Sequence, residues 1–176
     1  NGFNLADEAF LTYDDYYYST GGKAFRFKRK KTTERSEDGA EVIIPIIEPL
    51  QNIINDIGAK PEKGALVFPE ILKGAETTEE KHRRIQQENQ NVRKRLHMIC
   101  KDIFGWEERI SGTWARHSFA TNLRNAGVDM QYISESMGHS TQKTVTQLYL
   151  SSYPLNKQFE YNRRLLRLED EPTIDD

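Results

Sequence analysis

The hydrophobic positions follow two different periods along the chain, and together they predict a mainly helical protein with a small antiparallel sheet near its start. Strand-like alternation runs through the aromatic stretch from Tyr16 to Lys31 and again through residues 41–47, with a polar loop between them that predicts a hairpin. A third, short extended piece is predicted at residues 66–69. Apolar residues at helical spacing predict helices at about residues 5–10, 49–57, 79–104, 114–126, 129–137 and 155–168.

Capping signals support these boundaries. Asn4 and Asp129 stand at expected N-cap positions, Pro49 stands at the start of its helix, and glycines follow several of the helices. Ser140 or Thr141 is expected to cap one further short helix. The longest helix carries an apolar stripe that we expect to pack inward: Ile85, Val92, Leu96, Ile99 and Ile103.

No repeat or internal linker divides the chain, so the pattern predicts one domain over residues 1–168, followed by an acidic tail at 169–176 that we expect to be disordered. The length of 176 residues suits one domain with a sizeable core, and the 18 aromatic residues argue against disorder elsewhere. Cys100 is the single cysteine, which excludes disulfide frameworks and makes a reducing cytoplasm the default. No apolar run is long enough to span a bilayer and no secretory signal opens the chain, so we expect no membrane association.

The net charge of −2 conceals a block arrangement. Residues 21–36 hold seven basic residues against one acid, and residues 81–101 hold the same balance, so each block carries +6. The flanking stretches 1–20, 37–80 and 169–176 are acidic. Two basic segments in an acidic background are typical of a protein that meets an anionic partner with one face, although solvated charged surfaces give the same pattern.

One segment combines residues that suit phosphoryl transfer. Arg116 and His139 are predicted near the starts of successive short helices, and Tyr149 lies ten residues beyond that histidine. Arginine offers a charged fork for phosphate oxygens, histidine donates a hydrogen bond, and nearby cations lower the pKa of a tyrosine hydroxyl. Such a set supplies an oxyanion clamp and a nucleophile.

The four histidines lack zinc-like spacing, and neither a phosphate-binding loop nor a dinucleotide motif is present, so no metal or cofactor is expected.

The sequence of this segment resembles the C-terminal motif of the tyrosine recombinases, the phage integrase family. Within residues 112–150, the stretches ARHSFATNLRNAGVD, ISESMGHST and YL follow that family's order. Weaker likeness extends to GFNLAD at the start, to the hairpin that ends in Lys-Lys-Thr, and to Val-Phe-Pro at 67–69. The resemblance therefore covers most of the chain and implies the tyrosine recombinase catalytic-domain fold.

The resemblance also implies roles. Tyr149 would be the nucleophile that forms a 3′-phosphotyrosyl bond with DNA, while Arg116 and His139 would hold the phosphate. Lys31 would be the general acid, with Lys30 or Lys28 as the alternative, and His117 would support the site from beside Arg116. The basic segments supply the expected DNA contacts: Lys28, Arg29, Lys30, Arg93 and Lys94.

Three departures from the family pattern matter. The first active-site arginine falls on Asn4, the first histidine falls on Thr113, and the interval from His139 to Tyr149 is one residue longer than the commonest spacing. Arg124 and Arg26 are candidates to replace the missing charge. A subgroup of mobile-element integrases is similar in lacking the first arginine, and we assign the chain to it.

The resemblance implies double-stranded DNA as partner, a bacterial and cytoplasmic setting, no cofactor, a tetramer on DNA for the full-length protein, and a monomer for the isolated domain. The chain begins inside the first motif, so we expect a truncated catalytic domain whose N-terminal DNA-binding domain lies upstream. The alternatives are a catalytically degenerate DNA-binding module of the same family and a nicking-closing enzyme similar to type IB topoisomerases. A metal-dependent nuclease is disfavoured because the sequence lacks a suitable carboxylate pair.

Overall fold

Helices dominate the structure, a computed structural model that describes residues 4–29, 41–108, 110–139 and 153–166. The described elements are, in chain order, α1 (Leu5–Glu8), α2 (Asp15–Ser19), β1 (Ala24–Lys28), β2 (Glu41–Pro45), α4 (Glu48–Ile57), the 3-10 helix η1 (Pro69–Leu72), α5 (Thr78–Phe104), α6 (Gly112–Asn125), α7 (Met130–Ser136), α9 (Leu155–Arg163) and the 3-10 helix η2 (Arg164–Leu166). This composition confirms the predicted class of a mainly α protein with a small antiparallel sheet.

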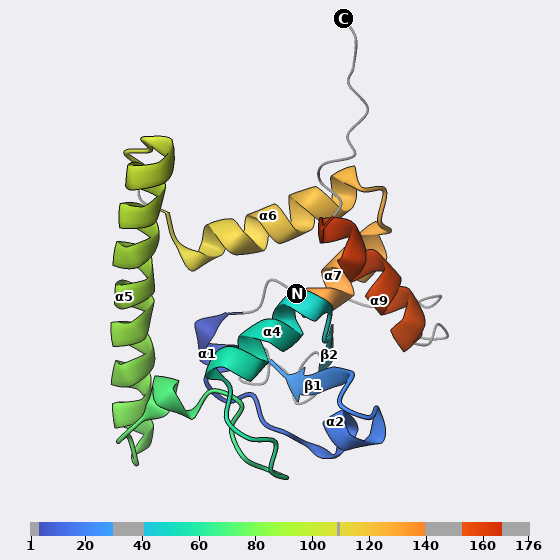
Figure 1. Ribbon diagram of the computed structural model, residues 1–176, viewed down its shortest axis with the longest axis horizontal. Coiled ribbons are helices and arrows are strands. Elements are labelled where there is room, and N and C mark those ends of the chain that lie inside the picture. The colour runs from blue at the N-terminus through green and yellow to red at the C-terminus, as the bar shows by residue number, and fades with distance from the viewer. Residues whose placement is uncertain (1–3, 30–40, 109, 140–152, 167–176) are drawn as a thin grey trace, which may run out of the picture.

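The two strands pair antiparallel, from Ala24 opposite Pro45 to Lys28 opposite Glu41. Figure 1 shows α5 standing at one side of the molecule, with α6 running from its C-terminal end towards α7 and α9. The strand pair, α2 and α4 lie below α6 in this view. Contacts join α7 and α9 to β2, so the C-terminal helices pack against the sheet.

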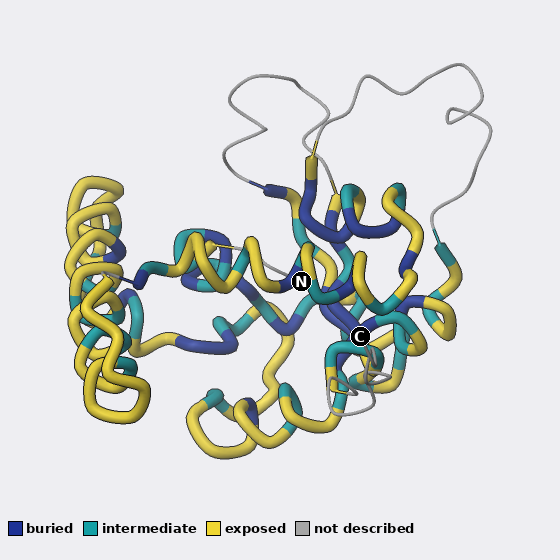
Figure 2. The backbone as a smooth tube through the Cα atoms, turned by 90° about the horizontal axis from the view of Figure 1, so that it is seen from above, coloured by how far each residue is buried: buried dark blue, intermediate teal, exposed yellow. Residues whose placement is uncertain are grey.

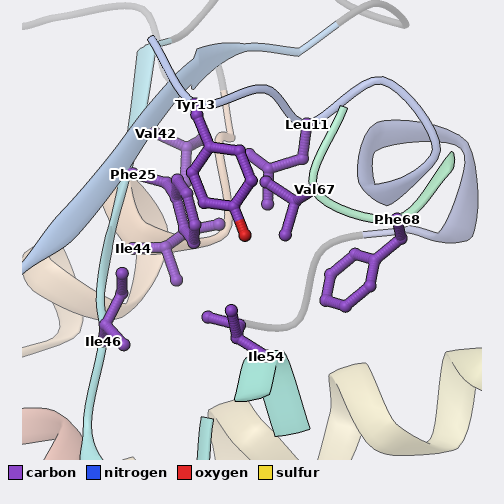
Figure 3. Packing of buried hydrophobic residues seen from close by; sticks show 9 residues of the cluster. All are labelled: Leu11, Tyr13, Phe25, Val42, Ile44, Ile46, Ile54, Val67 and Phe68. Carbon is purple, nitrogen blue, oxygen red and sulfur yellow. The ribbon is translucent and has the colours of Figure 1, made fainter. Parts of the chain in front are cut away.

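The main core lies between the strand pair, α4 and the segments around residues 11–13 and 67–68 (Figure 3). Its members are Leu11, Tyr13, Phe25, Val42, Ile44, Ile46, Ile54, Val67 and Phe68. A second cluster joins α6 and α7, and Tyr161 of α9 packs against it; its members are Phe119, Leu123, Val128, Tyr132, Ile133 and Met137. The two clusters hold the ends of β1 and α7 in place, where the candidate site lies.

Tyr13 is fully buried in the main core, and its hydroxyl donates a 2.8 Å hydrogen bond to the carbonyl of Ala59. A Tyr13→Phe variant is expected to lose about 1 kcal/mol of unfolding free energy, because it leaves the partly buried carbonyl of Ala59 without this donor. Urea unfolding measures the difference. Tyr18→Phe is the matched control, since Tyr18 is exposed. Equal loss in both variants would contradict the assignment.

The stretch from Tyr16 to Ser19 is helical, so the prediction of a strand there is wrong. The carboxylate of Asp14 accepts the backbone N–H of Tyr17 at 2.9 Å and caps α2. Gly21 and Gly22 then take positive φ angles of 65° and 75° and turn the chain into β1. Capping and glycine turns outweigh the strand preference of the aromatic residues here.

The long helix α5 contacts α1, η1 and α6 but buries little of its apolar stripe (Figure 2). Ile85 is buried, whereas Ile99 and Ile103 are exposed, so the expected inward packing of the whole stripe is wrong. The last predicted helix is α9, which gives way to η2 at Arg164. The expected helix after Ser140 and the acidic tail at 169–176 lie outside the described residues.

Candidate active site

Two of the predicted phosphate ligands meet in the structure. Arg116 lies in the first half of α6, and its Nη2 donates to the carbonyl oxygen of Met137 at 2.7 Å. The same nitrogen lies 2.8 Å from Nε2 of His139. A guanidinium carries only donors, so this ring nitrogen accepts and the imidazole is neutral, with its proton on Nδ1. Residues 23 positions apart are thus brought into direct contact.

The end of α7 fixes the position of His139. Asp129 accepts the backbone N–H groups of Gln131 and Tyr132 and caps the helix, which confirms the predicted N-cap. At the other end, Gly138 takes a φ of 62°, and the N–H of His139 reaches back to the carbonyl of Ser134 at 3.1 Å. The tight turn presents the His139 ring to Arg116.

Arg29, one of the expected DNA contacts, follows β1 directly and is buried. Its Nη1 donates to the carbonyls of Met137 at 3.0 Å and Gly138 at 3.4 Å. Its Nε lies 3.4 Å from Oδ2 of Asp7, which is also buried. The side chain points inward because strand residues alternate between faces, and Phe25 sets the buried face.

The close approach of Arg29 explains why residue 138 is a glycine. A Cβ at that position would lie 2.5 Å from Cδ of Arg29 and 2.8 Å from Cγ2 of Val42. The positive φ adds a second reason, because side-chain-bearing residues rarely take it. The glycine of the Met-Gly-His-Ser stretch therefore serves both the turn and the packing beneath it.

The site is electropositive. Burial lowers the pKa of His139, and the positive charges of Arg116 and Arg29 lower it further. Burial and the charge of Arg29 also lower the pKa of Arg116, while the charge of Asp7 opposes this shift. Two guanidinium groups and a histidine thus lie close together, and one carboxylate, Asp7, lies beside Arg29. Such a group of donors suits an anion with several oxygens.

The other expected site residues are placed as follows. Thr113 and His117 are exposed on α6. Asn4 is the exposed N-cap residue of α1, and its backbone N–H lies 3.4 Å from Oδ2 of Asp7, the oxygen that also meets Arg29. Lys28 is exposed at the end of β1, and Arg93 and Lys94 are exposed on α5. Lys30, Lys31 and Tyr149 lie outside the described residues.

The two residues proposed to replace the missing arginine do not join the described cluster. Arg26 lies 3.6 Å from Glu41 and stacks over the ring of Tyr16. Arg124 is exposed in the last turn of α6, eight residues beyond Arg116. Asp7 and the inward position of Arg29 were missed from the sequence, although the alternation of Phe25, Phe27 and Arg29 on one strand face is a signal for the latter.

Beyond the site, Tyr153 ties the start of α9 to α7. Its hydroxyl donates to Oδ1 of Asp129 at 2.9 Å, and its ring packs edge-on against Tyr132. Burial and the adjacent Asp129 carboxylate raise the pKa of Tyr153.

Within the described parts of the chain, no three His, Cys, Asp or Glu side chains gather in a way that would hold a metal ion. None of the helices seen there has the length and apolar character needed to cross a membrane.

Comparisons with known proteins agree with the resemblance seen in the sequence. A profile described as the phage integrase family matches residues 24–155. Two curated relatives, both named tyrosine recombinase XerC, come from Leptospira interrogans serogroup Icterohaemorrhagiae, one from serovar copenhageni strain Fiocruz L1-130 and one from serovar Lai strain 56601. Each is 47% identical over 47 residues, which cover 27% of this chain and 15% of the relative.

The match therefore spans less than a sixth of the length of these relatives. No solved structure gives a significant match. The family profile extends from the first residue of β1 to the first residue of α9 and includes Arg29, Arg116 and His139. On this evidence, the chain belongs to the phage integrase family.

Proposed function

We propose that this chain is the catalytic domain of a site-specific DNA recombinase that cuts and rejoins strands through a 3′-phosphotyrosyl intermediate. The observation that carries the proposal is the convergence of Arg116 and His139, which stand 2.8 Å apart at the turn that ends α7. The proposal places residues 1–168 in this domain and the DNA-binding domain outside it. Its partner is double-stranded DNA.

In the proposed reaction, the Tyr149 oxygen attacks the phosphorus of one DNA phosphodiester, and the bond from phosphorus to the 5′-oxygen breaks. The phenol proton leaves to solvent, and Lys31 gives a proton to the departing 5′-oxygen. Arg116 and His139 stabilise the charge on the non-bridging oxygens, where a guanidinium fork and an imidazole N–H suit the transition state. Reversal of these steps, with a 5′-hydroxyl from another strand, rejoins the DNA without an external energy source.

The unliganded arrangement fits this role. His139 Nε2 accepts from Arg116, and its Nδ1 carries the ring proton. Entry of a phosphate oxygen between the two groups would replace this hydrogen bond with one from Arg116 and one from His139, whose Nε2 first takes up a proton from solvent. The lowered pKa of His139 keeps the ring neutral at physiological pH until an anion binds.

Covalent trapping tests the proposal. The chain is incubated with a pool of nicked duplexes of randomised sequence, in which the cleaved strand loses a short 5′-hydroxyl fragment and religation fails. EDTA is present and ATP is absent. We expect an SDS-stable adduct at the 3′ end of the cleaved strand. DNA binding without any adduct would favour the degenerate binding module, and adducts that never join a strand from a second duplex would favour the nicking-closing enzyme.

The exposed bases of α5 are proposed to contact the DNA backbone. A double variant, Arg93→Ala with Lys94→Ala, is expected to reduce the salt dependence of duplex binding, with the slope of log K against log salt falling by about 2. Fluorescence anisotropy at several salt concentrations measures the slope. Lys60→Ala with Lys73→Ala is the charge-matched control, because both lysines are exposed on other segments. Equal slopes for the two double variants would contradict the proposal.

A further inference from the structure

We propose that Arg29 is a positioning residue of the active site, which holds the turn from Met137 to His139 against Arg116 and supplies the second guanidinium charge there. The inference rests on the proposed function and assigns to this site a residue that the charge pattern alone places on the DNA-binding surface. Three observations carry it: a shared carbonyl, a buried counter-charge and a glycine that the arginine requires.

The shared carbonyl belongs to Met137. Arg29 donates to it from β1 at 3.0 Å, and Arg116 donates to it from α6 at 2.7 Å. Because both guanidinium groups donate to the same oxygen, they lie close enough together for their positive charges to repel each other. A bound anion relieves that repulsion, so the pair is arranged for a negatively charged ligand.

The buried counter-charge is Asp7. Its Oδ2 lies 3.4 Å from Nε of Arg29, and the same oxygen lies 3.4 Å from the backbone N–H of Asn4. The carboxylate therefore orients the Arg29 fork and ties it to the start of α1. Asn4 itself carries no charge, whereas Arg29 places a cation beside α1 through its contact with Asp7.

Gly138 gives independent support for a fixed position. The aliphatic stem of Arg29 fills the space that any side chain at residue 138 would need, with Cδ only 2.5 Å from an ideal Cβ. The stem and the fork thus act together, because the stem packs under the turn while the fork holds two of its carbonyls. A loss of this side chain would leave the base of the His139 turn without its support.

The first test reads the charge at His139 without any need for activity. Among the described residues, the charged groups that face His139 are Arg116 from α6 and Arg29 from the end of β1, with Asp7 of α1 behind Arg29. In Arg29→Gln, an amide can still donate to Met137 but the charge is gone. The His139 pKa, followed by NMR titration of the histidine ring signals, should therefore rise towards its ordinary value. Lys60→Gln is the charge-matched control, because Lys60 is exposed on another segment.

An unchanged His139 pKa in folded Arg29→Gln would overturn the inference. If this variant does not fold, as judged by circular dichroism, Arg29→Lys decides. It keeps the charge, so the His139 pKa should stay lowered, and a rise to the ordinary value would overturn the inference equally.

The second test reads the rate of adduct formation. Arg29→Gln should slow it by about 100-fold, as expected when a donor that organises an oxyanion site is lost. Arg29→Lys should restore part of the rate, and Lys60→Gln, at an exposed lysine on another segment, should stay within a few-fold of wild type. A rate for Arg29→Gln equal to that of Lys60→Gln would overturn the inference. A wild-type chain that forms no adduct would overturn the proposed function instead, and the titration would still decide the role of Arg29.

Discussion

Replacing Tyr149 with phenylalanine is expected to abolish the SDS-stable DNA adduct completely, while leaving duplex binding and thermal stability unchanged. Phenylalanine keeps the ring but lacks the oxygen that would bond to phosphorus, so the covalent step cannot occur at any rate. Single-turnover trapping on a nicked duplex, followed by gel electrophoresis and peptide mapping of the adduct, measures the effect.

Tyr153 is the matched control for this substitution, because it lies four residues further along the chain and carries the same side chain. Its hydroxyl is engaged with Asp129, and its raised pKa disfavours the phenolate that attack on phosphorus requires. Tyr153→Phe should therefore form adduct at nearly the wild-type rate, with a small loss of stability. An adduct that survives Tyr149→Phe and disappears in Tyr153→Phe would reassign the nucleophile.

Replacing Arg116 with methionine is expected to slow adduct formation by about 1000-fold, near the upper end of the effect for one lost oxyanion donor. Methionine retains much of the stem but removes the charge and both contacts of Nη2, with Met137 and His139. Arg116→Lys should recover only part of the rate, because an ammonium group is a point charge without the planar fork.

The control for Arg116 is Arg124→Met on the same helix. Arg124 is exposed in the last turn, so its loss should change the rate by less than threefold or so, as for a distant surface charge. Quench-flow measurement of the adduct at saturating DNA separates chemistry from binding. A loss below tenfold for Arg116→Met, in a variant that still unfolds cooperatively, would remove Arg116 from the proposed role.

Much of the fold could be predicted from the sequence because its signals are local. The cap at Asp129, the proline near the start of α4 and the period of α6 and α7 each lie within one or two helical turns. The short helix α2 was not predicted, because three successive tyrosines favour a strand. Asp14 before them caps a helix instead. That competition is settled by capping and by the turn that follows.

The candidate site also has one part that the sequence predicts and one part that depends on long-range contacts. Arg116 and His139 carry a recognisable motif, and the structure brings them together. Arg29 could not be assigned from charge, because its role depends on a contact with Met137 across 108 residues of sequence. Strand alternation predicts that its side chain faces inward, but the meeting of the end of β1 with the end of α7 depends on how the two core clusters pack.

The hydrogen bond between Tyr153 and Asp129 has a consequence for the reach of the proposed nucleophile. Asp129 caps the start of α7, a helix of seven residues, and His139 follows its end, so Tyr153 and Arg116 contact residues at the two ends of one short helix. Four residues of extended chain span at most about 14 Å, which bounds the distance from Tyr153 to Tyr149. Within the proposed function, the nucleophile therefore belongs to the short stretch of chain that the contact between Tyr153 and Asp129 anchors.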